Sequence, residues 1–390
     1  MSKNTQILIL VSLTAFLRPF AQLIYVPSQI SLGADYGISL AVVGLTLSVY
    51  ALVFAFAQIF FGPIVDRFDG QRIMLIGTAI FILASLGAVF SKSIENFLAM
   101  RALQGLGIAA MVIVGIALIS DAIPQNERGK AMGVFEIFNA AGAAAAPMIG
   151  ALVAIWFSWR FDFLVLVMFG ILIGMFTYWR FPQQVKVEQR VGLVEMISIL
   201  RAPTPFGSIL DGFVKFYSIF TVFALIPVFL VTNLSLSESQ SGVITSLLPI
   251  SAMGGSFIGG RAADKYNNRS MMLWGSSITL VAFSAMTYLS STKGSMSPSI
   301  LLGVSIVIAG LAIGFCLPMQ LKLVVDYYPD MRATASGLLI FSRFIGSAIT
   351  PVVSGYLAST VSVAAGFGLN TLMIAIALIM MFFTIQDKES

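Results

Sequence analysis

Five ionisable side chains lie deep inside apolar stretches of this chain, where a charge is costly. On membrane-insertion scales such a group near mid-bilayer costs about 2.5–3.5 kcal/mol. It therefore needs an oppositely charged partner, a water-filled cavity or a functional role. Asp211 and Lys215 are four residues apart on one helical face, so they can neutralise each other. The five residues are Arg18, Glu136, Asp211, Lys215 and Arg343.

Proton transfer is the chemistry that these residues support best. Glu136 has no opposite charge within its own stretch, and an apolar, intermittently wet site favours the protonated form of a carboxyl group. We therefore expect Glu136 first, and Asp211 second, to carry a proton. Arg343 or Arg18 would be the cation whose approach expels that proton. A fixed ion pair between Glu136 and Arg343 is the structural alternative.

Several other kinds of chemistry are excluded by the residue types. The chain contains no histidine, which rules out His-ligated zinc sites and every Ser-His or Cys-His nucleophile. Its single cysteine, Cys316, cannot form an internal disulfide. No Gly-x-x-x-x-Gly-Lys-Ser/Thr nucleotide-binding motif occurs. We therefore predict no enzyme activity, no catalytic residue, no cofactor and no metal.

Twelve apolar stretches must position these side chains. Hydrophobic residues make up 58% of the 390 residues and charged residues 10%, whereas a soluble domain carries about 25% charge. A bilayer core of about 30 Å needs roughly 20 helical residues. The predicted membrane spans are 6–31, 40–65, 71–91, 97–120, 129–154, 161–181, 205–232, 239–262, 270–289, 298–327, 333–359 and 364–384.

Basic residues indicate the orientation of the chain. The predicted loops on one side hold nearly all of the loop Lys and Arg residues, and the opposite loops carry only Lys92, Arg160 and Lys293. The positive-inside rule then places both termini in the cytoplasm of a multi-pass protein of the plasma or inner membrane. The net charge of +5 is thus an orientation signal and not a sign of nucleic-acid binding. The expected partners are the lipid bilayer, a small-molecule substrate and protons, with the chain acting as a monomer.

The second six spans look like a copy of the first six. The motif Gly-x-x-x-Asp followed by a basic residue occurs after span 2 and again after span 8. Four separate positions of span 5 also have the same residue types 204 residues later in span 11. These matches predict halves at 1–181 and 205–390, joined by a linker at 182–204, around one central cavity. The matched residues are Gly62, Asp66 and Arg67 with Gly260, Asp264 and Lys265, and Arg128, Gly133, Gly142 and Pro147 with Arg332, Gly337, Gly346 and Pro351.

This organisation resembles the major facilitator superfamily over essentially the whole chain. Residues 62–72 resemble the family's cytoplasmic signature between spans 2 and 3, which is thought to latch the two halves in one access state. The resemblance implies that Asp66 and Arg67 hold the latch, with Asp121 as a partner for Arg72, and that Gly62, Gly260, Asp264 and Lys265 belong to it. The chain departs from the family where Asp69 replaces a glycine. A charged turn that obeys the positive-inside rule is the alternative.

Two further motifs resemble those of proton-coupled members. Arg101-Ala-Leu-Gln104-Gly105 resembles the Arg-x-x-Gln-Gly motif, which adds Arg101 to the proton-coupling residues; otherwise Arg101 extends to the membrane interface. Residues 142–151 resemble the signature of the drug:proton antiporter branch, with alanine in place of two glycines. For these small residues individually we expect helix packing and no direct substrate contact.

The resemblance implies twelve transmembrane helices in two pseudo-symmetric six-helix bundles, and secondary active transport by alternating access. We predict proton-coupled export of a small amphipathic or drug-like molecule. The alternative is proton-coupled transport of a small organic anion or organic phosphate, which requires Arg18 and Lys215 to converge without acidic partners. The predicted substrate-binding residues are Arg18, Gln22, Tyr25, Tyr50, Asn139, Lys215 and Gln320.

Overall fold

A computed structural model of the chain describes residues 3–67, 69–122, 125–181, 199, 201–291, 298–328 and 332–385. Every regular element within these ranges is a helix. Twelve helices are long and apolar enough to cross a membrane, which confirms the twelve predicted spans. Contacts divide the chain into two compact units: unit 1 comprises residues 1–38 and 45–190, and unit 2 comprises residues 39–44 and 191–390. The linker predicted at 182–204 lies mostly outside the described residues.

The helices follow one another with short connections. The first half of the chain contains α1 (Lys3–Leu23), the 3-10 helix η1 (Val26–Ser28), α2 (Gln29–Tyr36), α3 (Leu40–Arg67), α4 (Gly70–Val89), α5 (Ile94–Ala122), α6 (Gln125–Trp156) and α7 (Arg160–Arg180). The second half contains α9 (Pro203–Thr232), α10 (Glu238–Lys265), α11 (Asn268–Ser291), α12 (Pro298–Tyr327), α13 (Arg332–Thr360) and α14 (Val363–Thr384).

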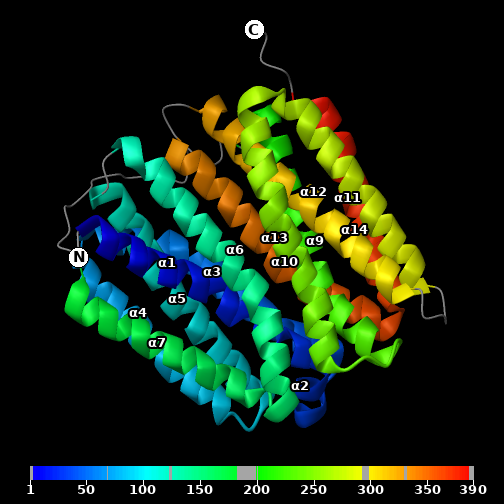
Figure 1. The fold of residues 1–390 in the computed structure, drawn as a ribbon, viewed down its shortest axis with the longest axis horizontal. Coiled ribbons are helices and arrows are strands. Elements are labelled where there is room, and N and C mark those ends of the chain that lie inside the picture. Colours follow the sequence, from blue (N-terminus) through cyan, green and yellow to red (C-terminus); the bar gives the residue numbers. More distant parts are fainter. Residues whose placement is uncertain are drawn as a thin grey trace. The chain divides into compact units, whose positions relative to one another are not determined.

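The first predicted span is not one continuous helix, contrary to the expectation for residues 6–31. Helix α1 ends at Leu23, and the chain passes through η1 before α2 begins (Figure 1). Pro27 explains the break, because it has no amide hydrogen and its ring clashes with the carbonyl group of Leu23. Helix α2 is fixed by Asp35, whose carboxylate accepts hydrogen bonds from Trp159 (2.9 Å) and Arg160 (2.6 Å) at the start of α7.

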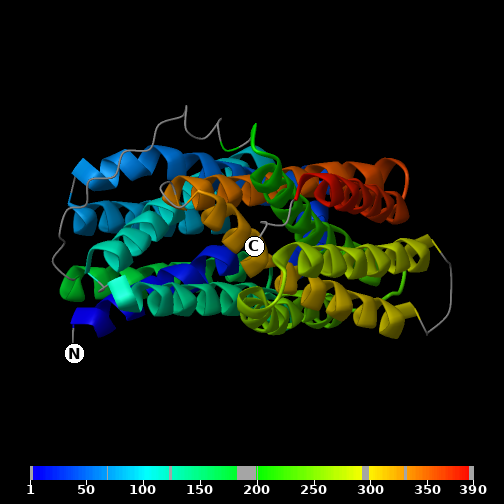
Figure 2. The ribbon, with the colours of Figure 1, turned by 90° about the horizontal axis from the view of Figure 1, so that it is seen from above.

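The same helix pairs pack in both units. In unit 1, α1 packs on α6, and α4 packs on both α5 and α7 (Figure 1). In unit 2, the corresponding pairs are α9 with α13, and α11 with α12 and α14. Figure 2 shows α13 and α14, in orange and red, side by side within unit 2. The recurrence of these pairs agrees with two pseudo-symmetric six-helix bundles.

Small residues allow these helices to approach closely. In α6, a Cβ atom at Gly142 would collide with the carbonyl oxygen of Phe16 in α1, and one at Gly150 would collide with that of Ile24, the residue after α1. Ala146 lies one turn from each of these glycines and is fully buried. The antiporter-like signature of span 5 therefore acts in packing, as expected for its individual residues.

Helices α10 and α12 pack through a reciprocal arrangement of four glycines. Gly255 and Gly259 of α10 lie against the carbonyl groups of Leu311 and Phe315, and Gly310 and Gly314 of α12 lie against those of Leu248 and Ala252. Each pair is spaced four residues apart, so both glycines of a helix face the same neighbour. This is the small-xxx-small geometry that allows two membrane helices to touch at their backbones.

Valine at Gly150 is expected to destabilise unit 1, because its side chain would displace α1 from α6. Overpacking of this kind costs about 1–3 kcal/mol. The measurement is the thermal unfolding midpoint of the purified protein in a lipid nanodisc. The control is Gly337→Ala, because a Cβ at Gly337 meets no other atom within 4 Å. Equal midpoints for the two variants would contradict the packing described here.

Large apolar side chains cover the outer surface of the helices. On α7, Phe161 is exposed near one end, and Tyr178 and Trp179 are exposed near the other. Trp179 follows Phe161 by 18 residue steps, which correspond to about 27 Å of helix rise, close to the thickness of a bilayer core. Aromatic residues gather at both membrane interfaces, so α7 has the pattern of a complete span.

Candidate functional site: two buried polar networks

The first buried network surrounds Arg101, which extends from α5 into the interior of unit 1. Its guanidinium group donates hydrogen bonds to the carbonyl oxygens of Thr46 (3.1 Å) and Ala21 (3.0 Å) and to Oε1 of Gln104 (2.7 Å). The Gln104 amide in turn donates to Ser85 Oγ (2.8 Å). Arg101 has no exposed surface, so the alternative in which it reaches the membrane interface is wrong.

Aromatic rings complete the surroundings of Arg101. Its guanidinium carbon lies 4.5 Å from the centre of the Tyr50 ring and 4.9 Å from that of Tyr25. The Tyr25 hydroxyl shares a hydrogen bond with Thr46 Oγ1 at 2.8 Å. Desolvated cation–π contacts contribute about 2 kcal/mol each. Tyr25, which lies between α1 and η1, and Tyr50 of α3 were predicted as substrate contacts. Both are buried neighbours of Arg101 of α5.

A second group in unit 1 lies around Arg18, in the C-terminal third of α1. Arg18 donates two hydrogen bonds to Oδ1 of Asn139 in α6, from Nε (3.2 Å) and Nη2 (2.5 Å). The Tyr50 hydroxyl donates to the carbonyl oxygen of Arg18 at 2.8 Å, which connects this group to the Arg101 network. Gln22 is buried, and its Nε2 has no hydrogen-bond partner in the described part of the chain.

The second buried network is the charge network of unit 2, which we define as Asp211, Lys215, Ser276, Gln320 and Arg343. The carboxylate of Asp211 accepts hydrogen bonds from Gln320 Nε2 (2.6 Å) and Ser276 Oγ (3.2 Å), and it lies 3.7 Å from Lys215 Nζ. Gln320 Oε1 accepts a hydrogen bond from Arg343 Nη2 (2.7 Å). Helices α9, α11 and α12 thus meet at one buried carboxylate, and α13 joins the network through Gln320.

Lys215 belongs to the interior of unit 2. Its ammonium group donates to Thr279 Oγ1 at 3.1 Å, and the side chain has no exposed surface. The sequence-based prediction that Asp211 and Lys215 neutralise each other is consistent with this geometry. The condition for an organic-anion carrier, an unpaired Lys215, is not met.

The repeat places Arg18 and Arg343 in a reversed arrangement. Adding 198 to 18 gives Phe216 of α9, and adding 204 to 139 gives Arg343 of α13. In unit 1 the cation is therefore on the first helix of the pair and the amide is on the second. In unit 2 the cation is on the second helix, and its guanidinium carbon lies 5.5 Å from the ring centre of Phe216.

The predicted latch residues and Glu136 belong to none of these networks as far as the structure describes them. The side chains of Glu136, Gly62, Asp66, Arg67, Asp121 and Asp264 lie outside the described residues, and their predicted roles stay predictions. Arg72 is exposed and lies 3.6 Å from Asp69. Asp69 caps the N-terminus of α4, because its side chain accepts a hydrogen bond from the backbone amide of Gln71. In the second copy of the latch motif, at residues 260–265, Gly260 faces open space and Lys265 is exposed.

Several polar residues that link the helices were not among the predicted site residues. Ser276 and Thr279 occur one helical turn apart in α11, where they face Asp211 and Lys215. Lys322 of α12 donates to the carbonyl oxygen of Ala263 near the end of α10 (2.7 Å). The three-residue spacing of Ser276 and Thr279 is a signal in the sequence, but serine and threonine are common in membrane helices and bond to their own backbone.

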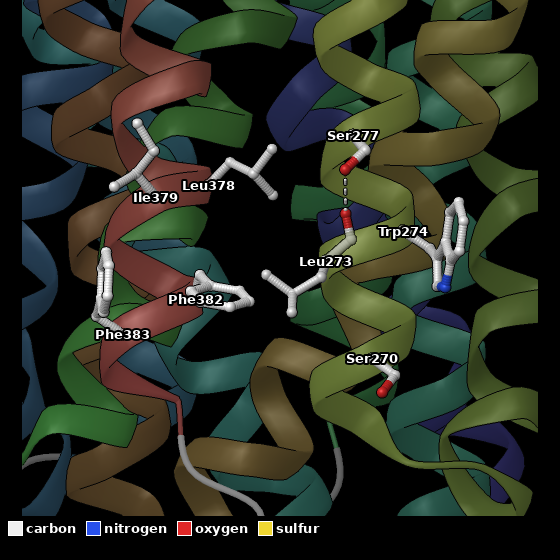
Figure 3. A pocket seen from close by; sticks show the side chains of 8 residues that line it. All are labelled: Ser270, Leu273, Trp274, Ser277, Leu378, Ile379, Phe382 and Phe383. Carbon is white, nitrogen blue, oxygen red and sulfur yellow. Dashed lines mark hydrogen bonds between the residues drawn. The ribbon is translucent and has the colours of Figure 1, made fainter.

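Two grooves of unit 2 lie on the outer, apolar surface and contain none of the predicted site residues. One, of about 490 Å³, lies between α11 and α14, where Leu273, Leu378 and Phe382 project into the space between the helices (Figure 3). The other, of about 500 Å³, lies among α10, α11 and α12 and includes Gly255 and Gly275. Their linings are almost entirely apolar, which is typical of surfaces that contact lipid.

Comparison with known proteins identifies the family. The family model described as Major Facilitator Superfamily matches residues 11–295 and 209–390. The chain belongs to the major facilitator superfamily. Major facilitator proteins are transporters, so this chain is a multi-pass membrane protein for secondary transport and not an enzyme.

Its relatives within the superfamily include drug-resistance proteins. The chain is 26% identical over 363 residues to Multidrug resistance protein D of Escherichia coli strain K12, covering 92% of this chain and 90% of that protein. It is 31% identical over 192 residues to a Bicyclomycin resistance protein homolog of Haemophilus influenzae, a match that spans only 48% of that relative. The chain thus resembles the drug-resistance members of the superfamily.

A solved transporter structure has the same fold. The structure of a D-xylose–proton symporter matches 100% of this chain and 99% of its own chain, with a TM-score of 0.83 and 14% sequence identity. At this level of identity the likeness supports the two-bundle fold and nothing about the substrate.

Proposed function

We propose that this major facilitator protein exports small amphipathic or drug-like molecules in exchange for protons. The observation that carries the proposal is the buried carboxylate of Asp211, which is 1% exposed and lies beside Lys215. A buried ionisable group inside a membrane bundle is costly unless it serves a task such as proton relay. The resemblance to drug-resistance relatives supports the substrate class.

The geometry of the charge network suggests how a proton would act. Ionised Asp211 accepts hydrogen bonds from Gln320 and Ser276 and offsets the charge of Lys215. Protonation removes that negative charge, so the interactions that join α9 to α11 and α12 weaken together. Ionisation restores them. Two states of unit 2 that differ in the proton on Asp211 would provide the coupling that alternating access requires.

Glu136 and Arg101 take different parts in this proposal. Glu136 of α6, the first-ranked proton carrier of the sequence analysis, stays in the proposal beside Asp211 on the basis of its sequence position. Arg101 donates to two backbone carbonyls and to Gln104, so it would act by holding α1, α3 and α5 together. The latch between the halves remains part of the proposal. We further propose a monomer in the cell membrane with both termini in the cytoplasm.

Transport into proteoliposomes with an imposed pH gradient tests the proposal. The probes are ethidium as a lipophilic cation, chloramphenicol as a neutral drug and benzoate as an organic anion. We expect accumulation of at least one drug-like probe on the acidic side, abolished when the proton gradient is dissipated by an ionophore. Drug transport that does not depend on the pH gradient would contradict proton coupling. Gradient-driven benzoate transport that is lost in Arg18→Ala would instead establish the anion-carrier alternative.

Glu136→Gln is expected to abolish gradient-driven accumulation while leaving the exchange of labelled for unlabelled probe across the same membrane. The amide keeps the size of the side chain but cannot carry a proton, so only the driven process should stop. The measurement compares the two processes in one preparation. Normal accumulation by the variant would show that Glu136 is not a coupling residue.

A further inference from the structure

We propose that the side-chain amide of Gln320 is a two-position switch that links the protonation of Asp211 to the release of Arg343. Gln320 was predicted as a substrate contact, but it is fully buried between an acid and a cation. The inference rests on the proposed function, because it requires Asp211 to gain and lose a proton. It adds the means by which that proton changes the contact between α12 and α13.

The orientation of the Gln320 amide is determined by its two neighbours. A carboxylate can only accept hydrogen bonds and a guanidinium group can only donate them. With Asp211 ionised, Nε2 must therefore face Asp211 (2.6 Å) and Oε1 must face Arg343 (2.7 Å). Each bond involves a charged group, and a chain of such bonds through one amide is mutually polarising.

Protonation of Asp211 creates a donor that needs an acceptor. Of the groups that contact its carboxylate, Gln320 Nε2 and Lys215 Nζ can only donate, and the Ser276 hydroxyl can do either. A flip of the Gln320 side-chain amide, which exchanges the positions of Oε1 and Nε2, presents Oε1 to the new O–H of Asp211. The same turn places Nε2 opposite the Nη2 donor of Arg343, so that hydrogen bond is lost. The proton stays on Asp211, and only hydrogen bonds change.

Loss of this bond weakens the attachment of α13 to α12. Arg343 Nη2 donates to two groups of α12, Gln320 Oε1 and the carbonyl oxygen of Leu317 (3.1 Å), and the switch removes the first. Lys215 retains its bond to Thr279. Protonation of Asp211 thereby increases the mobility of α13.

Few other titratable groups adjoin Asp211 in the described part of unit 2. Helix α9 contributes Lys215, α13 contributes Arg343 and α12 contributes the buried thiol of Cys316. The described side chains of α11 near Asp211 are Ser276 and Thr279, and Val363–Thr384 of α14 contains no titratable residue. In α10, the described charged side chains are Glu238, Arg261 and Lys265, toward its two ends.

Hydrogen exchange of α13 in the full-length protein, measured in nanodiscs at acidic and neutral pH and corrected for the intrinsic rate, tests the switch. In the wild type we expect exchange to rise about tenfold at acidic pH, the effect of losing one hydrogen bond to a charged group. Gln320→Met cannot hold Arg343, so α13 should exchange fast at both pH values. Gln320→Glu pairs with Arg343 but offers no N–H to Asp211, so α13 should stay protected at both.

The controls separate the switch from the proposed function. Ser305→Ala, on the same helix but bonded only to its own backbone, should behave as the wild type. Wild-type pH dependence of α13 in both Gln320 variants, with loss of that dependence in Asp211→Asn, would overturn the switch and leave proton coupling intact. Wild-type pH dependence in Asp211→Asn as well would overturn the role of Asp211 itself.

Discussion

Lys215→Met is expected to destabilise the protein by about 3–5 kcal/mol, because it removes the cation beside a buried carboxylate. Lys215 has no exposed surface and Asp211 is 1% exposed, so water cannot replace the lost charge. Thermal unfolding in nanodiscs measures the effect.

The double variant provides the sharper test of this pair. Asp211→Asn combined with Lys215→Met removes both charges, so it should be less destabilised than the sum of the single variants. Lys265→Met is the matched control, because Lys265 is exposed at the end of α10 and its loss should change stability by less than about 0.5 kcal/mol. Additive single effects would show that the two residues do not interact.

Arg101→Met is the second substitution expected to have a large effect. It leaves the carbonyl groups of Ala21 and Thr46 without their side-chain donor and removes the partner of Gln104, all in the interior of unit 1. Hydrogen bonds to charged groups contribute about 1.5–3 kcal/mol each, so the combined loss should be at least about 3 kcal/mol. Unfolding followed by proteolysis of unit 1 in the lipid-embedded protein measures it.

Two further variants distinguish position from charge. Arg101→Lys keeps the charge but loses the flat guanidinium group between Tyr25 and Tyr50, so it should recover only part of the stability. Arg72→Met removes an exposed arginine next to Asp69 and should be nearly neutral. If Arg101→Met were as mild as Arg72→Met, Arg101 would not join the helices of unit 1.

The positions of the membrane helices could be predicted from the sequence because the bilayer imposes a length and an apolar composition on every span. The repeat also predicted matching pairs, and α3 and α10 each end one residue after the matched Asp66 and Asp264. The exception is the first span, where Pro27 interrupts the helix after Leu23. Proline is tolerated inside other spans, such as Pro147 in α6, so its presence alone did not predict a break.

The partners of the buried polar residues were harder to predict. The spacing of Asp211 and Lys215 was sufficient for their pairing, because both lie on one helix. The contacts of Gln320 depend on how α12 packs against α9 and α13, which no local pattern records. The contacts of the Tyr25 and Tyr50 rings with Arg101 likewise depend on helix packing, and no local pattern predicted them.

The most direct test of proton coupling through Asp211 is the proton flux that accompanies drug movement in proteoliposomes without an imposed gradient. A pH-sensitive dye inside the vesicles reports protons while ethidium or chloramphenicol moves down its own gradient. We predict that protons move in the opposite direction in the wild type, and that in Asp211→Asn the probe still exchanges without any proton movement. Unchanged proton flux in Asp211→Asn would contradict the account.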